Sequence, residues 1–161
     1  FYDYNVYSIK DTTLQIKYKE SKLTDEVLVR LIELSKDWEK EDSCHGYRAN
    51  TKDDIEGNRI FLGEINGKII AYLFGSNQSS KKSSVMPEGT KYFEVEEIYV
   101  CPSFRSMGIG SALFDYMEKR VKDDAEYVLL STATKNWKAI FHFYIDELNM
   151  SFWNARLYKK L

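Results

Sequence analysis

A strand–helix–strand pattern in the second half of the chain constrains the fold most. Tyr92 to Val100 is rich in β-branched and aromatic residues and ends at Cys101-Pro102, where proline cannot donate to a sheet. Apolar residues then recur at helical spacing over Ile109 to Val121, and Tyr127 to Thr132 is an apolar strand. Two strands joined through a helix need a crossover, so this part of the sheet is predicted to be parallel.

An antiparallel part is predicted upstream. Arg59 to Ile65 and Lys68 to Gly75 are β-rich runs joined by Asn66-Gly67, which supplies the two positive-φ residues of a type I′ turn. Thr13 to Tyr18 alternates apolar and polar residues, which suits a half-buried strand. The sheet is therefore predicted to be mixed.

The remaining elements complete the expected order. Thr24 is an expected N-cap, followed by acidic residues and then by apolar residues at helical spacing to about Trp38. The fold class is α/β, a mixed and partly parallel β-sheet flanked by helices in the order β-α-α-β-β-β-α-β-α-β, within one domain over residues 1–161. Four other segments are expected to be a short helix (Thr51 to Gly57), an exposed loop (Ser76 to Thr90), a helix (Asn136 to Leu148) and a last strand (Phe152 to Tyr158).

Composition narrows the function classes. The 23 basic and 25 acidic residues give a net charge of -2, so no positive field favours nucleic acid. No apolar run approaches the ~20 residues that span a bilayer, and Phe1 to Asn5 does not resemble a secretory leader. Cys44 and His45 are adjacent, but the other histidine, His142, is remote, so no metal site is predicted. We expect a cytoplasmic protein that binds neither nucleic acid nor membrane; a homodimer is compatible with the sequence.

The segment between strand and helix carries the clearest chemical signal. In Arg105-Ser106-Met107-Gly108-Ile109-Gly110 two glycines stand where the helix begins, so the backbone can approach a ligand closely. The first-turn N–H groups and the helix dipole favour an anion there, and Arg105 adds a charged donor. The alternative is that the glycines only shape the turn. A Walker A loop needs Gly-Lys-Ser/Thr, and a Rossmann fingerprint needs a third small residue where Leu113 stands, so neither fits.

The order of these parts resembles the GNAT N-acetyltransferase superfamily. The match is best over Glu94 to Tyr144. There a strand ending in Val-x-Pro is followed by Arg-x-x-Gly-x-Gly at the start of a helix, and then by a strand and a second helix. The resemblance implies that acetyl-CoA is the cofactor and that its pyrophosphate binds the glycine loop. The chain departs from the family at Leu148-Asn149-Met150, where a small residue, Gly and Phe are usual.

The resemblance also assigns cofactor contacts. The backbone of the loop, with the serine that follows it, would hold the pyrophosphate, the preceding strand edge would pair with the pantetheine arm, and one stripe of the later helix would flank the cofactor. These residues are respectively Arg105, Ser106, Met107, Gly108, Ile109, Gly110 and Ser111; Ile98, Tyr99 and Val100; and Asn136, Ala139 and Phe143.

Tyr144 matches the family tyrosine that protonates the leaving thiolate, and a phenol can supply that proton at short range. The alternative is a core tyrosine, because Tyr144 shares a helical face with apolar neighbours. Glu94, Glu96 and Glu97 lie on the strand beside the reacting carbonyl, where one of them, Glu97 or Glu94 first, could take the proton of the amine directly or through water. A bulge would decide which of them face the site, and solvated or substrate-binding acids are the alternative.

Two functions follow from this interpretation. The first is direct transfer of acetyl to a primary amine in a ternary complex, with the backbone amide near Val100 polarising the thioester carbonyl. The second is a non-catalytic acyl-CoA sensor or interaction module. Acids and aromatic residues after the first helix suit a small-molecule or peptide amine, either a small cation or a lysine or N-terminal amine, although a solvated helix end explains them equally. They are Asp37, Trp38, Glu39, Glu41, Asp42 and Tyr47.

Overall fold

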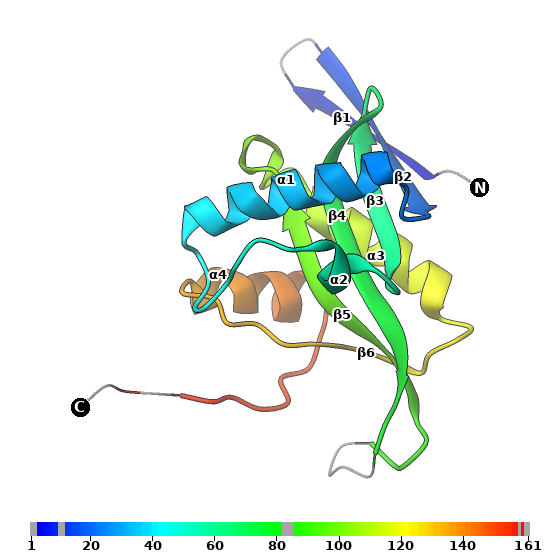
Figure 1. The fold of residues 1–161 in the computed structure, drawn as a ribbon, viewed down its shortest axis with the longest axis vertical. Helices are drawn as coiled ribbons and strands as arrows, with labels where there is room; N and C mark the ends of the chain where they lie inside the picture. The colour runs from blue at the N-terminus through cyan, green and yellow to red at the C-terminus, as the bar shows by residue number, and fades with distance from the viewer. Residues whose placement is uncertain (1–2, 10–11, 82–85, 158, 160–161) are drawn as a thin grey trace.

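A single mixed sheet organises the molecule. The computed structural model describes residues 3–9, 12–81, 86–157 and 159. Its six strands lie in the order β1-β2-β3-β4-β5-β6, and each neighbouring pair is antiparallel except β5 and β6, which are parallel (Figure 1). The predicted mixed, partly parallel sheet is confirmed. The strands are β1 (Asp3–Ile9), β2 (Thr12–Ser21), β3 (Arg59–Ile65), β4 (Lys68–Ser79), β5 (Lys91–Val100) and β6 (Tyr127–Leu130).

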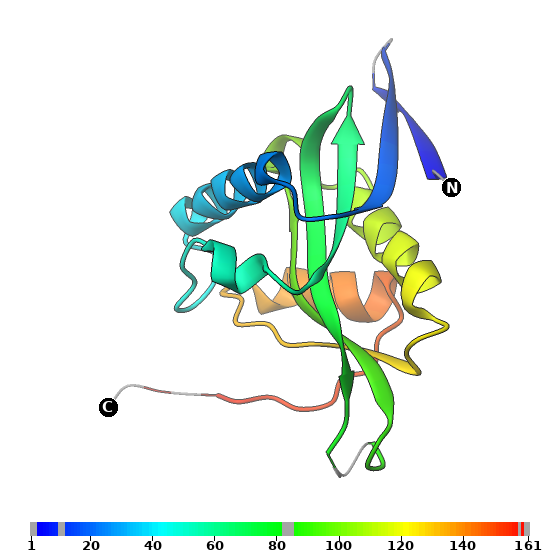
Figure 2. The same ribbon diagram turned by 45° about the vertical axis from the view of Figure 1, so that its right-hand side comes forward.

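Helices cover both faces of the sheet. The helices α1 and α2 lie on one face, and α3 and α4 lie on the other (Figures 1 and 2). Leu31 and Leu34 of α1 are buried on the first face, and Leu113 and Met117 of α3 on the second. The helical segments are α1 (Asp25–Glu41), α2 (Lys52–Ile55), η1 (Pro102–Phe104), α3 (Ile109–Val121), α4 (Trp137–Phe141) and η2 (His142–Glu147), the last a π-helical continuation of α4.

Local signals for caps and turns are confirmed. The Thr24 hydroxyl accepts the N–H of Val27 at 3.3 Å and caps α1, which extends past the predicted end to Glu41. Asn66 and Gly67 have φ of 50° and 78°, as a type I′ turn requires.

Strand assignments at the two ends of the chain differ from the prediction. The structure adds β1, which pairs with β2, and it forms no strand over residues 151–157; residue 158 lies outside the described residues. The predicted loop over 76–90 is also shorter, because β4 runs to Ser79 opposite Lys91 of β5. A strand needs a partner edge as well as a suitable pattern. Residues 151–157 have the pattern but no partner strand in the described part of the chain.

A β-bulge in β5 changes which side chains face which helix. Phe74 of β4 is opposite Glu97 and Gly75 is opposite Val95, so Glu96 is the extra residue. A Cβ on Gly75 would collide with the carbonyl oxygen of Glu94, so only glycine fits opposite the bulge. Val95 packs in the core between the sheet and α3, whereas Tyr99 packs in the core between the sheet and α1. Because the bulge lies between these two residues, Glu97 points to the side of the sheet that α1 and α2 cover.

Candidate active site

Among the residues that the structure describes, one edge of β5 has no partner strand beyond the bulge and is called the open edge below. β6 pairs with β5 only as far as Val95, and the chain after β6 then diverges from β5 (Figure 1). The N–H of Cys101 donates to the Ile70 carbonyl of β4 at 2.9 Å. Because successive N–H groups alternate in direction, those of Val100 and Ile98 point to the open edge. An extended ligand with amide groups can pair there as a further strand.

The glycine loop lies directly beside this edge. Gly108 is the N-cap of α3 with φ 73°, and the first α-helical bond is from Ala112 N–H to the Gly108 carbonyl at 3.0 Å. The N–H groups of the first turn therefore have no acceptor within the helix. A Cβ on Gly110 would lie 3.2 Å from the Phe143 ring and 3.7 Å from a Val100 methyl group, so loop, strand edge and η2 meet at Gly110.

The polar side chains of the loop bind the protein itself. Arg105 Nε donates to the Val100 carbonyl at 2.8 Å, and the two terminal nitrogens donate to both oxygens of Glu41 at 2.8 and 2.9 Å. The Ser111 hydroxyl donates to Glu147 at 2.9 Å. Within the described contacts, the loop therefore presents its main chain, and not the Arg105 guanidinium, as anion-binding groups. Met107 packs against the core, Ile109 is buried and Ser106 is exposed with φ 59°.

The later helix contributes one ring to this region. Phe143 meets Gly110, as described above. Asn136 is the N-cap of α4, and its Oδ1 accepts the N–H of Ala139 at 3.4 Å. Ala139 is exposed. Of the three predicted residues on this stripe, the structure brings Phe143 to the loop and uses the Asn136 side chain to cap its own helix.

Glu97 is held on the opposite side of the sheet by three donors. Its Oε2 accepts from Asn50 Nδ2 and the Tyr72 hydroxyl, each at 2.8 Å, and from the Tyr47 hydroxyl at 3.5 Å. Burial raises the pKa of Glu97, and these hydrogen bonds oppose the rise. Asn50 and Tyr72 were not among the residues predicted from the sequence. Gly75 was the available signal, since a glycine within a strand pattern suggests a bulge.

Glu94 and Glu96 lie outside this network. Glu94 precedes the bulge, where β5 is paired on both sides with Ser76 and Leu129. Glu96 is exposed, and partial burial together with the charge of Glu94 raises its pKa. Of the candidate bases, the structure therefore gathers donors around Glu97.

Tyr144 lies in η2 beside Phe143, with ring centroids 5.0 Å apart. Burial raises its pKa to about 12, with a smaller contribution from Cys44. Burial also raises the pKa of the Cys44 thiol, and the charge of Glu97 adds to that effect. A tyrosine with this pKa keeps its proton at neutral pH, as a general acid must.

A short ladder, here called the latch, joins the loop after α1 to the segment after β6. It comprises residues 42–45 and 133–135. The N–H of His45 donates to the Ala133 carbonyl and that of Lys135 to the Ser43 carbonyl, both at 2.8 Å, and Cys44 and Thr134 form an antiparallel bridge. The latch holds the loop that carries Cys44 against the segment that follows β6.

Known proteins share this sequence pattern and this fold. A model of the acetyltransferase (GNAT) family matches residues 26–144. The chain belongs to this family. It is 26% identical over 117 residues to mycothiol acetyltransferase of Rothia mucilaginosa, which covers 67% of this chain and 30% of that protein. The chain therefore spans less than a third of the length of that curated relative.

Solved structures show the same fold at low identity. An aminoglycoside N-acetyltransferase, AAC(6')-Iy, in complex with CoA has a TM-score of 0.62 and 15% identity, covering 89% of this chain and 98% of that one. An aminoglycoside acetyltransferase from an uncultured soil metagenomic sample, in complex with trehalose, has a TM-score of 0.63 and 15% identity over 89% and 96%. A Trypanosoma brucei acetyltransferase has a TM-score of 0.62 and 17% identity over 91% and 99%.

The features of this GNAT protein fit acetyl-CoA, the acyl donor that the family uses. The open edge at Ile98 and Val100 presents main-chain groups that an extended chain with amide groups can pair with. The first turn of α3 presents N–H groups that suit an anion such as a pyrophosphate. Gly110 keeps the approach to that turn free of a side chain.

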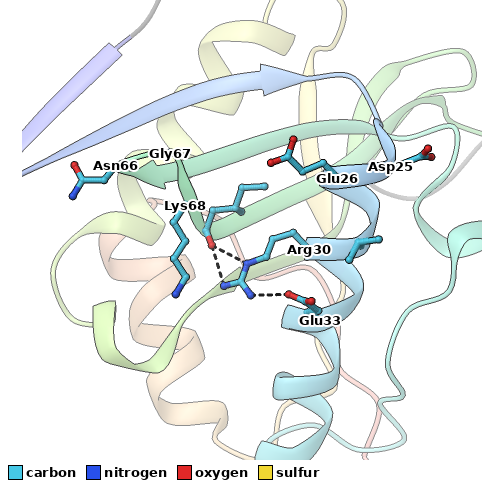
Figure 3. A pocket seen from close by; sticks show the side chains of 9 residues that line it. Asp25, Glu26, Arg30, Glu33, Asn66, Gly67 and Lys68 are labelled. Carbon is cyan, nitrogen blue, oxygen red and sulfur yellow. Dashed lines mark hydrogen bonds and ion pairs between the residues drawn. The ribbon is translucent and has the colours of Figure 1, made fainter.

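A groove of about 630 Å³ lies elsewhere, between the start of α1 and the β3–β4 turn. Arg30 in this groove donates to the Ile69 carbonyl and to Glu33 (Figure 3). Arg30 precedes Glu41 by 11 residues, about 16 Å along α1 at 1.5 Å per residue, so the groove lies apart from Glu41 and the groups that Glu41 binds. In the described part of the chain no group of three metal-ligating side chains gathers, and no helix is long and apolar enough to cross a membrane.

Proposed function

We propose that this protein transfers the acetyl group of acetyl-CoA to a primary amine by direct attack in a ternary complex. The observation that carries the proposal is the meeting of three parts at Gly110: the open β5 edge, the glycine loop at the start of α3, and the Phe143 ring of η2. Tyr144 lies beside that ring, and Glu97 precedes the open edge on β5. The proposal takes residues 1–161 as one acetyltransferase domain.

The donor side rests on main-chain groups. Bound acetyl-CoA would supply a thioester whose carbonyl carbon accepts the amine and whose sulfur leaves. The N–H groups of Ile98 and Val100 would hold the pantetheine arm, and one of them would polarise the carbonyl oxygen. The N–H groups from Gly108 to Ser111 would bind the pyrophosphate. The ring of Phe143 would bound the cofactor on its other side.

Proton transfer is assigned to two side chains. Glu97 would take a proton from the ammonium form of the acceptor, directly or through one water, because burial raises its pKa and so makes it a stronger base than an exposed carboxylate. Tyr144 would give its proton to the leaving sulfur, because its pKa of about 12 keeps it protonated until a basic thiolate forms. Glu94 is the second candidate for the base.

A cationic amine is the acceptor class that the loop after α1 favours. Trp38 lies between two tyrosines, with ring centroids 4.3 Å from Tyr47 and 5.5 Å from Tyr99. Glu97 accepts from one of these tyrosines and Glu41 from the other. Aromatic faces beside carboxylates attract small cations, lysine side chains or N-terminal amines.

The test is release of CoA thiol from acetyl-CoA with a panel of primary amines, together with calorimetric titration of CoA. We expect binding of CoA and amine-dependent thiol release. Binding of CoA without release across a broad panel would favour a sensor, and absence of binding would contradict the cofactor assignment as well.

A further inference from the structure

Glu97 receives its hydrogen bonds on one oxygen only. In the described part of the chain, Asn50, Tyr72 and Tyr47 all donate to Oε2, and no donor reaches Oε1. A carboxylate has about four lone-pair positions on its two oxygens, so three donors occupy Oε2 fully. Oε1 is therefore the oxygen that remains able to accept a proton.

The two short donors are themselves held in place. The backbone N–H of Asn50 donates to the Ser35 hydroxyl at 3.0 Å, and that hydroxyl donates to the Ile32 carbonyl of α1 at 2.8 Å. Tyr72 is fully buried, and its ring stacks on that of Phe74 with centroids 5.8 Å apart. Because α1 and β4 fix both donors, the orientation of the carboxylate is fixed with them.

We propose that Asn50 is a positioning residue of the transfer reaction and that it acts with Tyr72 to direct Oε1 of Glu97 toward the acceptor amine. The inference rests on the proposed function, which makes Glu97 the base. In the step, an N–H bond of the ammonium acceptor breaks and its proton goes to Oε1. The electron pair stays on nitrogen and forms the bond to the acetyl carbon as the carbon–sulfur bond breaks. The sulfur would leave with the proton of Tyr144, and the nitrogen would lose its second proton to water, which re-protonates Tyr144. Asn50 and Tyr72 keep their protons throughout.

Other ionisable groups surround Glu97 from each neighbouring element. They are Tyr72 of β4, Asp54 of α2, Cys44 of the latch, and Tyr47 and Arg48 of the loop between α1 and α2. The charge of Asp54 is compensated by two hydrogen bonds from Arg48, at 2.7 and 2.8 Å. The donors on Oε2 thus oppose the effect of burial on the pKa of Glu97, and loss of one donor moves that pKa upward.

The first experiment is the pH profile of kcat/KM for Asn50→Asp and Tyr72→Phe. Tyr72→Phe removes one donor from Oε2, whereas Asn50→Asp replaces the other short donor with a carboxyl group whose charge also opposes ionisation of Glu97. We expect the acid limb to move upward by about one pH unit in Tyr72→Phe and by at least as much in Asn50→Asp. At a pH on that limb, kcat/KM should fall about tenfold, while the KM for acetyl-CoA stays the same. Asn58→Asp is the matched control, because the Asn58 amide donates to the carbonyls of Asp54 and Ile55 and not to Glu97; its acid limb should stay at the wild-type pH.

A second measurement needs no turnover. The carboxyl ¹³C signal of Glu97 is followed by NMR through a pH titration of the ligand-free protein. The midpoint should rise in Tyr72→Phe and stay unchanged in Tyr99→Phe, because the Tyr99 hydroxyl donates to Glu41 instead.

The two proposals fail differently. An active wild-type enzyme whose acid limb and NMR midpoint are unmoved in folded Asn50→Asp and Tyr72→Phe overturns the positioning role and leaves the acetyl transfer intact. A wild-type protein that binds CoA but acetylates no amine overturns the proposed function and the positioning role with it.

Discussion

At the scale of single residues, the two proposed proton carriers differ in how they are held. Glu97 is fixed by three donors, whereas no side-chain hydrogen bond to Tyr144 is found among the described residues. The environment of Tyr144 is instead one of burial and ring packing, which leaves its hydroxyl able to turn toward a leaving group.

Tyr144→Phe keeps the ring and removes only this hydroxyl. We expect kcat to fall about 10²- to 10⁴-fold, the range for loss of a positioned acid, with the KM for acetyl-CoA unchanged. The free energy of unfolding should change by at most about 1 kcal/mol. Steady-state kinetics and urea unfolding check both, with Tyr127→Phe, an exposed tyrosine of β6, as the control. Near-normal turnover together with a lower melting temperature would instead indicate a core tyrosine.

Glu97→Gln tests the effect of burial on stability. Because the folded-state pKa of Glu97 is raised, the folded protein binds this proton more tightly than the unfolded chain does. Its contribution to stability is therefore complete below the unfolded pKa of about 4.3, and it is lost as pH rises through the folded pKa. Glu97→Gln has no carboxyl group to titrate and does not lose this contribution. The unfolding free energy of the variant minus that of the wild type should therefore increase from pH 4 to pH 8. Urea unfolding at both pH values measures the difference; a constant difference would mean that the donors cancel the effect of burial.

At the scale of elements, the β5 bulge decides the geometry of the site. Gly75→Ala places a methyl group against the Glu94 carbonyl and 2.9 Å from the Phe93 ring, which a paired strand cannot relieve. We expect the free energy of unfolding to fall by about 1–3 kcal/mol. We also expect a lower kcat, because a change in the bulge displaces Glu97. Gly63→Ala is the matched control, since its Cβ would meet side-chain atoms at 3.3 Å or more, and it should cost less. Chemical denaturation measures both variants. Equal losses of unfolding free energy in Gly75→Ala and Gly63→Ala would contradict a special requirement for glycine opposite the bulge.

Elements with a local signal were predictable from sequence, and elements defined by a partner were not. Thr24, Asn66-Gly67 and the Gly108 turn carry their own conformational preferences, so the cap, the hairpin and the start of α3 were found. Gly75 signals a bulge, but the place of the bulge at Glu96 and the absence of a strand over 151–157 depend on which edge is adjacent. Asn50 approaches Glu97 only through tertiary packing, and no spacing in the sequence records that contact.

At the scale of the whole molecule, the latch connects the two faces of the sheet. It joins the loop after α1, on one face, to the segment that leads to α4, on the other face. Cys44 and Thr134 are bridge partners, whose Cα atoms lie about 4.5–5.5 Å apart in antiparallel pairs. This spacing falls within the range of a disulfide, and Cys44 is a free thiol.

Thr134→Cys should therefore form a disulfide with Cys44 under oxidising conditions. Closing a loop of roughly 90 residues stabilises the fold by about 2–4 kcal/mol. Thermal unfolding with and without dithiothreitol measures the gain, which reduction should reverse. The double variant Cys44→Ser with Thr134→Cys cannot form this disulfide, so a gain that persists in it would argue against the bridge geometry.

The open edge of β5 allows the sequence of such a protein to change without loss of its ligand-pairing groups. The groups that face it at Ile98 and Val100 are main-chain amides, which every residue except proline supplies. Substitution of the Ile98 and Val100 side chains therefore leaves the hydrogen-bonding surface for an extended ligand in place. Structures that share 15–17% of their residues with this chain keep the same fold. In such a lineage the acyl donor can stay constant while the side chains that select the acceptor change freely.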